Sequence, residues 1–150
     1  MNFYYFDTSA FLKRYVDEKG STYISQMVED GVPFVVATVT YTEMLMALRR
    51  KKADKALSSE DYQTAVEEIT MDWPGLKKID IDDGFHDRVR DVADMLRHDR
   101  HLKALDAVHL ASALTLQRRL PQLVFMTADK QLQDVAGEFA FPVDDPEQHP

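Results

Sequence analysis

The sequence predicts an α/β fold in which a mostly parallel sheet of five strands lies between helices. Two observations lead to this prediction. Five short apolar runs recur along the chain, and the stretches between most of them are long enough for a helix. Those stretches carry apolar residues at helical spacing. Strands that alternate with helices pair in parallel, because each helix returns the chain to the same end of the sheet.

The predicted strands are short and differ in strength. The first, residues 2–6 (NFYYF), is aromatic and ends abruptly at the acidic and hydroxyl residues that follow. The second, residues 33–37 (PFVVA), is apolar throughout, as expected of a strand that is buried on both faces. The remaining strands are predicted at residues 76–81, which is the weakest, 122–126 and 139–143.

The predicted helices follow from apolar periodicity and from residues typical of helix ends. A helix at residues 21–31 ends with Gly31 as the residue after its C-cap. A helix that begins at Ser58 or Ser59 uses that serine as its N-cap. Further helices are predicted at residues 8–16, 40–53, 82–98, 102–116 and 128–137, the last ended by Gly137.

Length, composition and charge narrow the class of protein. The chain has 150 residues, so we expect one domain at residues 1–145 and a flexible polar tail at 146–150. The lack of cysteine excludes disulfides and thiolate zinc sites. The net charge of −8 argues against nonspecific nucleic-acid coating. We see no signal peptide and no apolar run that could span a membrane, and we expect a cytoplasmic location.

Four acidic residues stand where strands end or a helix begins. Asp7 follows the first strand, and Glu43 and Asp129 lie in the first turns after the second and fourth strands. Asp106 lies near the start of an apolar helix, where an unpaired carboxylate is costly. Sites in parallel sheets gather outside the carboxyl ends of the strands, so we expect all four acids at one edge. A hard divalent cation would relieve their repulsion, and oxygen ligands select Mg²⁺ or Mn²⁺ rather than zinc.

The first two acids also have purely structural explanations. Asp7 could cap the helix that follows it, with help from Thr8 and Ser9. Glu43 closes the stretch Thr40–Glu43, which matches a capping box in which the glutamate returns to the N-cap amide.

The other two acids have weaker structural explanations. Asp129 could interact with the helix dipole while Thr127 caps that helix. Asp106 could pair with a buried arginine or lysine, but its neighbours on the same helix offer little. His109 shares a face with Asp106, and we interpret it as a hydrogen-bonded core residue more readily than as a base or ligand.

At these residues the sequence resembles the PIN-domain ribonucleases, and within them the VapC-type toxins of prokaryotic toxin–antitoxin pairs. The resemblance extends over nearly the whole chain and rests on YYFDTSAFLKRY, TVTYTEMLMAL, LKALDAVHLASAL and VFMTADKQL. It implies a three-layer PIN-like fold. It also implies that Asp7, Glu43, Asp106 and Asp129 bind Mg²⁺ or Mn²⁺ and cleave RNA, with Thr127 as a hydroxyl near the fourth acid.

Together, the acid pattern and the resemblance predict a metal-dependent endoribonuclease. Asp7 and Asp106 are expected to hold the principal metal, and Glu43 and Asp129 to complete the site directly or through waters, with Ser9 and Thr127 as supporting hydroxyls. The expected partners are an RNA substrate, an antitoxin protein and a second copy of the chain in a homodimer. Candidate contacts to RNA or antitoxin are Arg14, Arg49, Arg50 and Arg100.

Two other functions stay open at this stage. The chain could be a non-catalytic PIN-like binding module, although such a module has no reason to retain four acids that repel one another. It could also be an aspartate-based phosphatase, with Asp7 as nucleophile. That alternative is weaker, because Ser9 stands where the haloacid-dehalogenase pattern needs a second aspartate.

Overall fold

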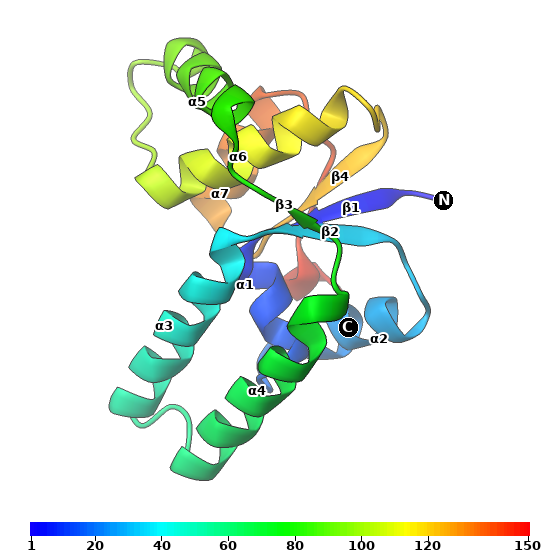
Figure 1. Cartoon of the computed structure of the whole chain (residues 1–150), viewed down its shortest axis with the longest axis vertical. Coiled ribbons are helices and arrows are strands. Elements are labelled where there is room, and N and C mark those ends of the chain that lie inside the picture. Colours follow the sequence, from blue (N-terminus) through cyan, green and yellow to red (C-terminus); the bar gives the residue numbers. More distant parts are fainter.

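The structure is a computed structural model that describes residues 1–150, apart from the side chain of Asp83. The described chain contains one five-stranded sheet with the strand order β3-β2-β1-β4-β5, and every pair of neighbouring strands is parallel. Helices cover both faces of the sheet (Figure 1). The predicted three-layer α/β architecture is therefore confirmed, and the sheet is parallel throughout rather than mostly parallel.

The strands are β1 (Phe3–Phe6), β2 (Phe34–Ala37), β3 (Lys78–Ile79), β4 (Leu123–Met126) and β5 (Val143–Asp144). The α-helices are α1 (Thr8–Phe11), α2 (Ser21–Glu29), α3 (Val39–Ala53), α4 (Ser59–Asp72), α5 (Asp83–Met95), α6 (Ala104–Gln117) and α7 (Lys130–Glu138). Short 3₁₀ helices are η1 (Leu12–Arg14), η2 (Trp73–Gly75) and η3 (Pro146–Gln148). Among the described residues, no helix is both long and apolar enough to cross a membrane.

The sheet separates two hydrophobic cores. Successive side chains of a strand point to opposite faces, so Tyr5 packs with α5, α6 and α7 while its neighbour Phe6 packs with α1 to α4. Phe6 stacks on Phe34 of the adjacent strand, with ring centroids 4.7 Å apart. Because both cores rest on the same sheet, β1 at its centre is held from both sides, and the residue that follows β1 has a fixed position.

Helices α3 and α4 extend side by side away from the sheet (Figure 1). The Ser58 side chain accepts a hydrogen bond from the Asp61 amide at the start of α4, which decides between the two predicted N-caps. Gly31 follows α2 with a positive φ of 72°, as predicted for the residue after a C-cap. Helix α3 begins directly after β2, so its end nearest the sheet carries Glu43.

The prediction was wrong about how the last helix ends. Helix α7 continues through Gly137 to Glu138, and the left-handed residue after it is Ala140, with φ of 65°. The amide of Phe141 donates to the carbonyl of Ala136, and the Ala140 amide donates to the carbonyl of Gly137. These two bonds are the Schellman pattern, which here places alanine in a conformation that favours glycine.

The same turn corrects the fifth strand. Residues 139–141 (Phe-Ala-Phe) end the helix instead of pairing with β4, and β5 is only Val143–Asp144. The third strand is likewise shorter than predicted, at Lys78–Ile79. Both are edge strands, which form ladder hydrogen bonds on one side only and are often short in natural sheets.

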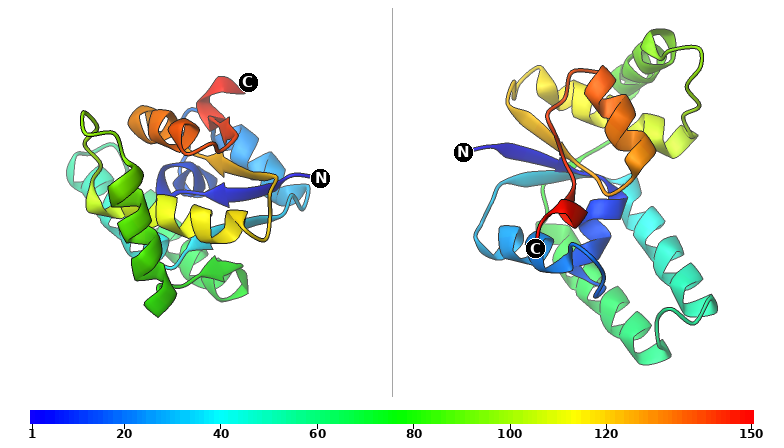
Figure 2. Two further views of the ribbon diagram at one scale, coloured as in Figure 1. Left: turned by 90° about the horizontal axis from the view of Figure 1, so that it is seen from above. Right: turned by 180° about the vertical axis from the view of Figure 1, so that it is seen from behind.

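Residues 146–150, predicted to be a flexible tail, include η3 and several side-chain contacts in the structure. His149 stacks on Tyr23 with ring centroids 3.6 Å apart, and its Nε2 lies 2.7 Å from Asp144 Oδ1. Asp145 forms an ion pair with Lys130. Figure 2 shows this C-terminal segment beside α2. Glu147 in this segment forms an ion pair with Lys13 of η1.

Candidate active site

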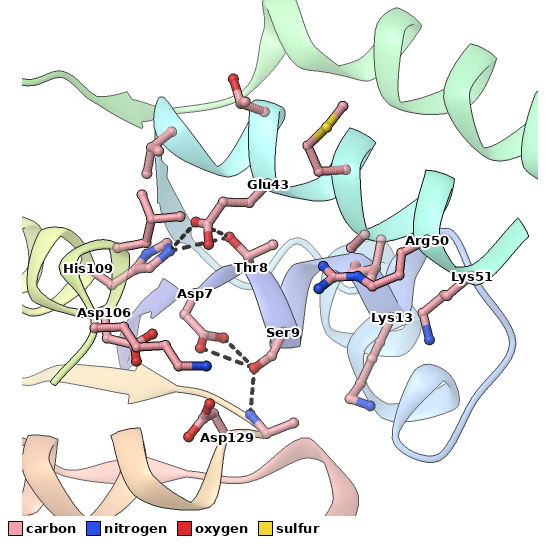
Figure 3. Close-up of a pocket in the computed structure, with 18 of the residues that line it drawn as sticks. Asp7, Thr8, Ser9, Lys13, Glu43, Arg50, Lys51, Asp106, His109 and Asp129 are labelled. Carbon is pink, nitrogen blue, oxygen red and sulfur yellow. Dashed lines mark hydrogen bonds and ion pairs between the residues drawn. The ribbon is translucent and has the colours of Figure 1, made fainter. Parts of the chain in front are cut away.

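A cleft of about 800 Å³ opens at the carboxyl ends of β1, β2 and β4. Four acids line this cleft, and each lies in or caps a different helix. Sites of parallel sheets are expected at this edge, so the topology accounts for their meeting. Figure 3 shows the cleft with these acids labelled: Asp7, Glu43, Asp106 and Asp129.

Asp7 caps α1 and is also the most buried acid of the cleft. One carboxylate oxygen accepts the Ala10 amide at 2.9 Å, and the other accepts the Thr127 hydroxyl at 2.6 Å. Ser9 Oγ donates to the same carboxylate at 2.8 Å. Burial raises the Asp7 pKa, and these hydrogen bonds and the nearby His109 counteract only part of that rise. The carboxylate is therefore held rigidly in a place that disfavours its negative charge.

Ser9 and Thr127 connect the strand exits of β1 and β4. The Ala128 amide donates to Ser9 Oγ at 3.0 Å, and the Asp129 amide donates to Thr127 Oγ1 at 3.1 Å. Each hydroxyl thus accepts from the loop after β4 and donates to Asp7. These two residues fix the position of the Asp7 carboxylate in the way that supporting hydroxyls would.

Glu43 does not form the capping box that its sequence allows. Helix α3 begins at Val39, one residue before the predicted start, and its N-cap makes no side-chain hydrogen bond. Glu43 Oε1 instead accepts the Thr8 hydroxyl at 2.7 Å and lies 2.6 Å from Nε2 of His109. Burial raises the Glu43 pKa, but the hydrogen bonds from His109 and Thr8 and the electrostatic influence of the imidazole outweigh it, and the pKa is lowered. This acid is held as a carboxylate inside the cleft.

Asp106 lies in the first turn of α6 and is half-buried rather than deep in the core. Burial raises its pKa, and the negative charge of Asp129 raises it further. Lys103 and His109 oppose this rise only in part. Among the described side chains, none forms an ion pair with Asp106. The alternative of a buried cationic partner on this protein is therefore not supported.

Asp129 both caps a helix and faces the cleft. Its Oδ1 accepts the Leu132 amide at 2.9 Å at the start of α7. The structural alternative in which Thr127 caps this helix does not apply, since Asp129 itself is the N-cap and the Thr127 hydroxyl donates to Asp7. The capping role does not remove Asp129 from the acid cluster, because its charge acts on Asp106.

The donor set fits a hard divalent cation, although the carboxylates do not form a closed cage. In the described part of the chain, no group of three or more histidine or acidic side chains is arranged to hold an ion directly. One carboxylate oxygen of Asp129 and one of Glu43 accept hydrogen bonds from the protein, so these oxygens are already occupied. Oxygen-only donors and two acids with raised pKa suit an ion such as Mg²⁺, which usually keeps several waters as ligands.

His109 has a larger part in the site than the sequence indicated. It is buried, as expected of a core residue, and Nδ1 lies 2.6 Å from the Tyr5 hydroxyl. Its other ring nitrogen lies at Glu43. The periodicity of α6 does not reveal this second contact, because Tyr5 and Glu43 come from other elements.

Only one of the four candidate basic contacts lines the cleft. Arg50 does so, on the second turn of α3 beyond Glu43. Arg14 pairs with Glu29 at 3.2 Å and Arg100 with Glu138 at 2.6 Å, both outside the cleft, and Arg49 is exposed on α3. Three lysines also line the cleft: Lys13, Lys51 and Lys103.

Lys13 is unusual among these lysines because only 3% of its side chain is exposed. Its Nζ lies 3.0 Å from Glu18 and 3.1 Å from Glu147. Glu18 also pairs with Lys51 at 3.0 Å. A lysine in the sequence YYFDTSAFLKRY carries no sign of this burial, since Glu147 lies at the other end of the chain.

Comparisons with known proteins identify the family of the chain. The family model for the PIN domain matches residues 4–138. The chain is 28% identical over 128 residues to ribonuclease VapC45 and to ribonuclease VapC49 of two Mycobacterium tuberculosis strains, and covers 85% of each. The resemblance to VapC-type PIN ribonucleases is thereby confirmed.

Two solved structures share the fold at low sequence identity. One is the crystal structure of DNA-bound VapBC from Salmonella typhimurium, with a TM-score of 0.66, 12% identity and coverage of 97% of this chain and 99% of that one. The other is VapBC2 from Rickettsia felis bound to a promoter DNA fragment, with a TM-score of 0.63, 8% identity and coverage of 95% and 98%. These likenesses concern the fold alone.

Proposed function

Because this chain belongs to the PIN-domain family, we propose that it is a divalent-metal-dependent endoribonuclease and the toxin of a toxin–antitoxin pair. The observation that carries the proposal is the meeting of four acids at the carboxyl edge of the sheet. Two of them, Asp7 and Asp106, have raised pKa values there. A fold that needed only helix caps would gain nothing from acids placed where they repel one another.

Asp7 and Asp106 would hold the principal Mg²⁺ or Mn²⁺ ion, and Glu43 and Asp129 would complete the site directly or through waters. When bound, such an ion lowers the pKa of a water and neutralises charge on the scissile phosphate. Ser9 and Thr127 keep the Asp7 carboxylate in place. Water would then displace a ribose oxygen from phosphorus by in-line attack, so no covalent protein nucleophile is needed.

The positive side chains at the mouth of the cleft suit the phosphates that flank the cleavage point. Arg50 and Lys51 lie on α3, and Lys103 lies at the start of α6 beside Asp106. Most contacts between proteins and nucleic acids are made to the phosphate backbone and position the substrate without reading its sequence. We assign this positioning to Arg50 and Lys103 in preference to Arg14 and Arg100, which are engaged by acids.

The partners follow from the same proposal. The VapBC complexes that share the fold pair a VapC with a VapB, and we propose an antitoxin partner and a homodimer for this chain, acting on RNA in the cytoplasm. Sedimentation at several concentrations tests the dimer. Co-expression with a candidate antitoxin tests whether growth arrest by the toxin is relieved.

The decisive experiment is cleavage of a structured RNA by the purified protein with Mn²⁺ and with EDTA. We expect cleavage only with the metal, and we expect Asp7→Asn and Asp106→Asn to abolish it. Asp99→Asn is the matched control, because Asp99 is an exposed acid outside the cleft, paired with Arg97. Wild-type cleavage by either cleft variant would show that the site assignment is wrong.

Metal binding is measured separately from cleavage. A ligand that binds only the folded state raises the melting temperature with its concentration. We expect Mn²⁺ to stabilise the wild type and Asp99→Asn, and to have much less effect on Asp7→Asn. Stabilisation without cleavage would mean that the metal site is real and the chosen RNA is not the substrate. Neither effect in the wild type would refute the proposed function.

A further inference from the structure

A buried chain of hydrogen bonds leads from the sheet to one acid of the cleft. The Tyr5 hydroxyl lies 2.6 Å from His109 Nδ1, and His109 Nε2 lies 2.6 Å from Glu43 Oε1. Tyr5 is fully buried and His109 is 2% exposed. Figure 3 shows the imidazole beside Glu43 and Thr8 at the wall of the cleft. Three elements, β1, α6 and α3, thus join in one polar network.

For a neutral imidazole, the geometry assigns the protons of this network. A tyrosine hydroxyl has one proton, and a neutral imidazole has one donor nitrogen and one acceptor nitrogen. Glu43 Oε1 is a carboxylate oxygen and can only accept, so the imidazole proton belongs on Nε2. Nδ1 is then an acceptor, and the Tyr5 hydroxyl donates to it. Every group in the chain is satisfied by this arrangement.

The same arrangement limits the freedom of Glu43. Thr8 Oγ1 and His109 Nε2 both bind Oε1, from two different elements. A glutamate side chain has three rotatable bonds, and the sequence also offers it a capping role at the start of α3. The two donors hold it across the cleft instead. Among the described residues, Oε2 has no protein hydrogen-bond partner, so it is the oxygen available to the site.

We propose that Tyr5 and His109 are positioning residues for Glu43: the Tyr5 hydroxyl holds the imidazole in place through Nδ1, and Nε2 of His109 then fixes the carboxylate toward the acid cluster. Metal-ligating groups are commonly oriented in this way by partners that do not touch the metal. Without the Tyr5 hydroxyl, Nδ1 would lose its buried donor, and the ring would keep only the bond from Nε2 to Glu43. The imidazole, and with it the Glu43 carboxylate, would then be held less firmly.

The location of the imidazole proton is measured directly by NMR of the ring nitrogens in the metal-free protein. The chain has five histidines, and His109→Gln identifies the signal to follow. We expect the Nε2–H form in the wild type and, in Tyr5→Phe, a shifted Nδ1 signal with the proton still on Nε2. Tyr15→Phe is the matched control, because it removes a hydroxyl that bonds Asp72 outside the cleft. An Nδ1–H form in the wild type would overturn the proposal.

The effect on Glu43 is measured through the Mn²⁺ dependence of the melting temperature and through RNA cleavage. His109→Leu removes the donor, whereas the amide of His109→Gln can still reach Glu43. We expect His109→Leu to weaken Mn²⁺ binding on the order of 10- to 100-fold, the usual range for such partners. His109→Gln should restore most of this loss, and KM for RNA should change less than kcat. Thr115→Ala, which removes a hydroxyl bonded to the helix backbone on α6, is the control.

A double-mutant cycle separates positioning from general damage. If His109 acts through Glu43, adding His109→Leu to Glu43→Gln should weaken Mn²⁺ binding little beyond Glu43→Gln alone. Additive losses, or a His109→Gln variant no better than His109→Leu, would overturn the positioning role. The metal and cleavage measurements rest on the proposed function, but the tautomer does not. If the wild type neither bound Mn²⁺ nor cleaved RNA, the proposed function would fail and the NMR result alone would decide the Tyr5–His109 arrangement.

Discussion

Replacing Lys13 by methionine tests how burial sets the strength of an ion pair in this protein. Lys13 and Lys51 both lie 3.0 Å from Glu18, but their side chains are 3% and 34% exposed. Methionine retains most of the apolar stem of the lysine and removes the charge. Each variant removes an ion pair of 3.0 Å to the same acid in different surroundings, and Lys13→Met also removes the pair with Glu147 at 3.1 Å.

The expected magnitudes follow from distance and exposure. At 3.0 Å and an effective dielectric constant of about 20, the Coulomb energy is about 5 kcal/mol per pair. Desolvation of the buried ammonium cancels much of this gain, and removing one partner of a buried pair typically costs about 3–5 kcal/mol. Glu18 and Glu147 are each 30% exposed and can regain water, so we expect about 2–3 kcal/mol for Lys13→Met. Lys51→Met should cost under about 1 kcal/mol.

Denaturation by guanidinium chloride, followed by circular dichroism, measures both variants. For a chain of this length, Lys13→Met should also lower Tm by roughly 5–10 °C. Equal losses in the two variants would refute the argument, because they would show that burial does not decide the energy. A stabilised Lys13→Met would show that desolvation outweighs both ion pairs.

The pH dependence provides a second test of the same pair. Burial raises the pKa of Glu18, but the hydrogen bonds from Lys13 and Lys51 lower it below its ordinary value. An acid with a lowered folded-state pKa stabilises the fold above its unfolded pKa, and this contribution is lost as pH falls through the folded value. The stability advantage of the wild type over Lys13→Met should therefore be complete at neutral pH and shrink below about pH 4.

Three further predictions concern other parts of the chain. Ala140→Gly should stabilise the protein by about 0.5–1 kcal/mol, because Ala140 has φ of 65°, a left-handed conformation that glycine adopts without strain. Urea denaturation measures this change, and a loss of stability would contradict the prediction. Gly20→Ala should destabilise by about 2 kcal/mol or more, because φ is 89° and a Cβ would meet the Pro146 carbonyl at 2.8 Å; an unchanged Tm would contradict the close approach. The pKa of Asp7 is raised in the folded state, so in the metal-free wild type the free energy of unfolding should decrease as pH rises from about 4 to that raised pKa. Asp7→Asn lacks this carboxyl group, so its stability relative to the wild type should increase over the same pH range. Denaturation at several pH values measures that difference, and a constant difference would contradict it.

Local sequence signals accounted for most of the fold. The apolar strand β2 and the aromatic strand β1 were predicted within one residue at each end, because their apolar runs are short and clearly bounded. The edge strands were predicted less well. At β5 the two phenylalanines at residues 139 and 141 resemble strand residues, but they are buried beneath the end of α7. A helix end with alanine in the left-handed conformation has no reliable sequence signal.

The sequence by itself determined where the four acids stand, since each follows a strand or opens a helix and a parallel sheet brings such positions to one edge. Tertiary structure alone decided what each acid touches. Glu43 could have formed a capping box, and only the arrival of His109, 66 residues away, and of Thr8 draws it into the cleft. Lys13 became a buried ion-pair centre because Glu147, 134 residues away, lies beside it. Hydrogen bonds and ion pairs act over a few ångströms, so their partners are set by how distant segments pack.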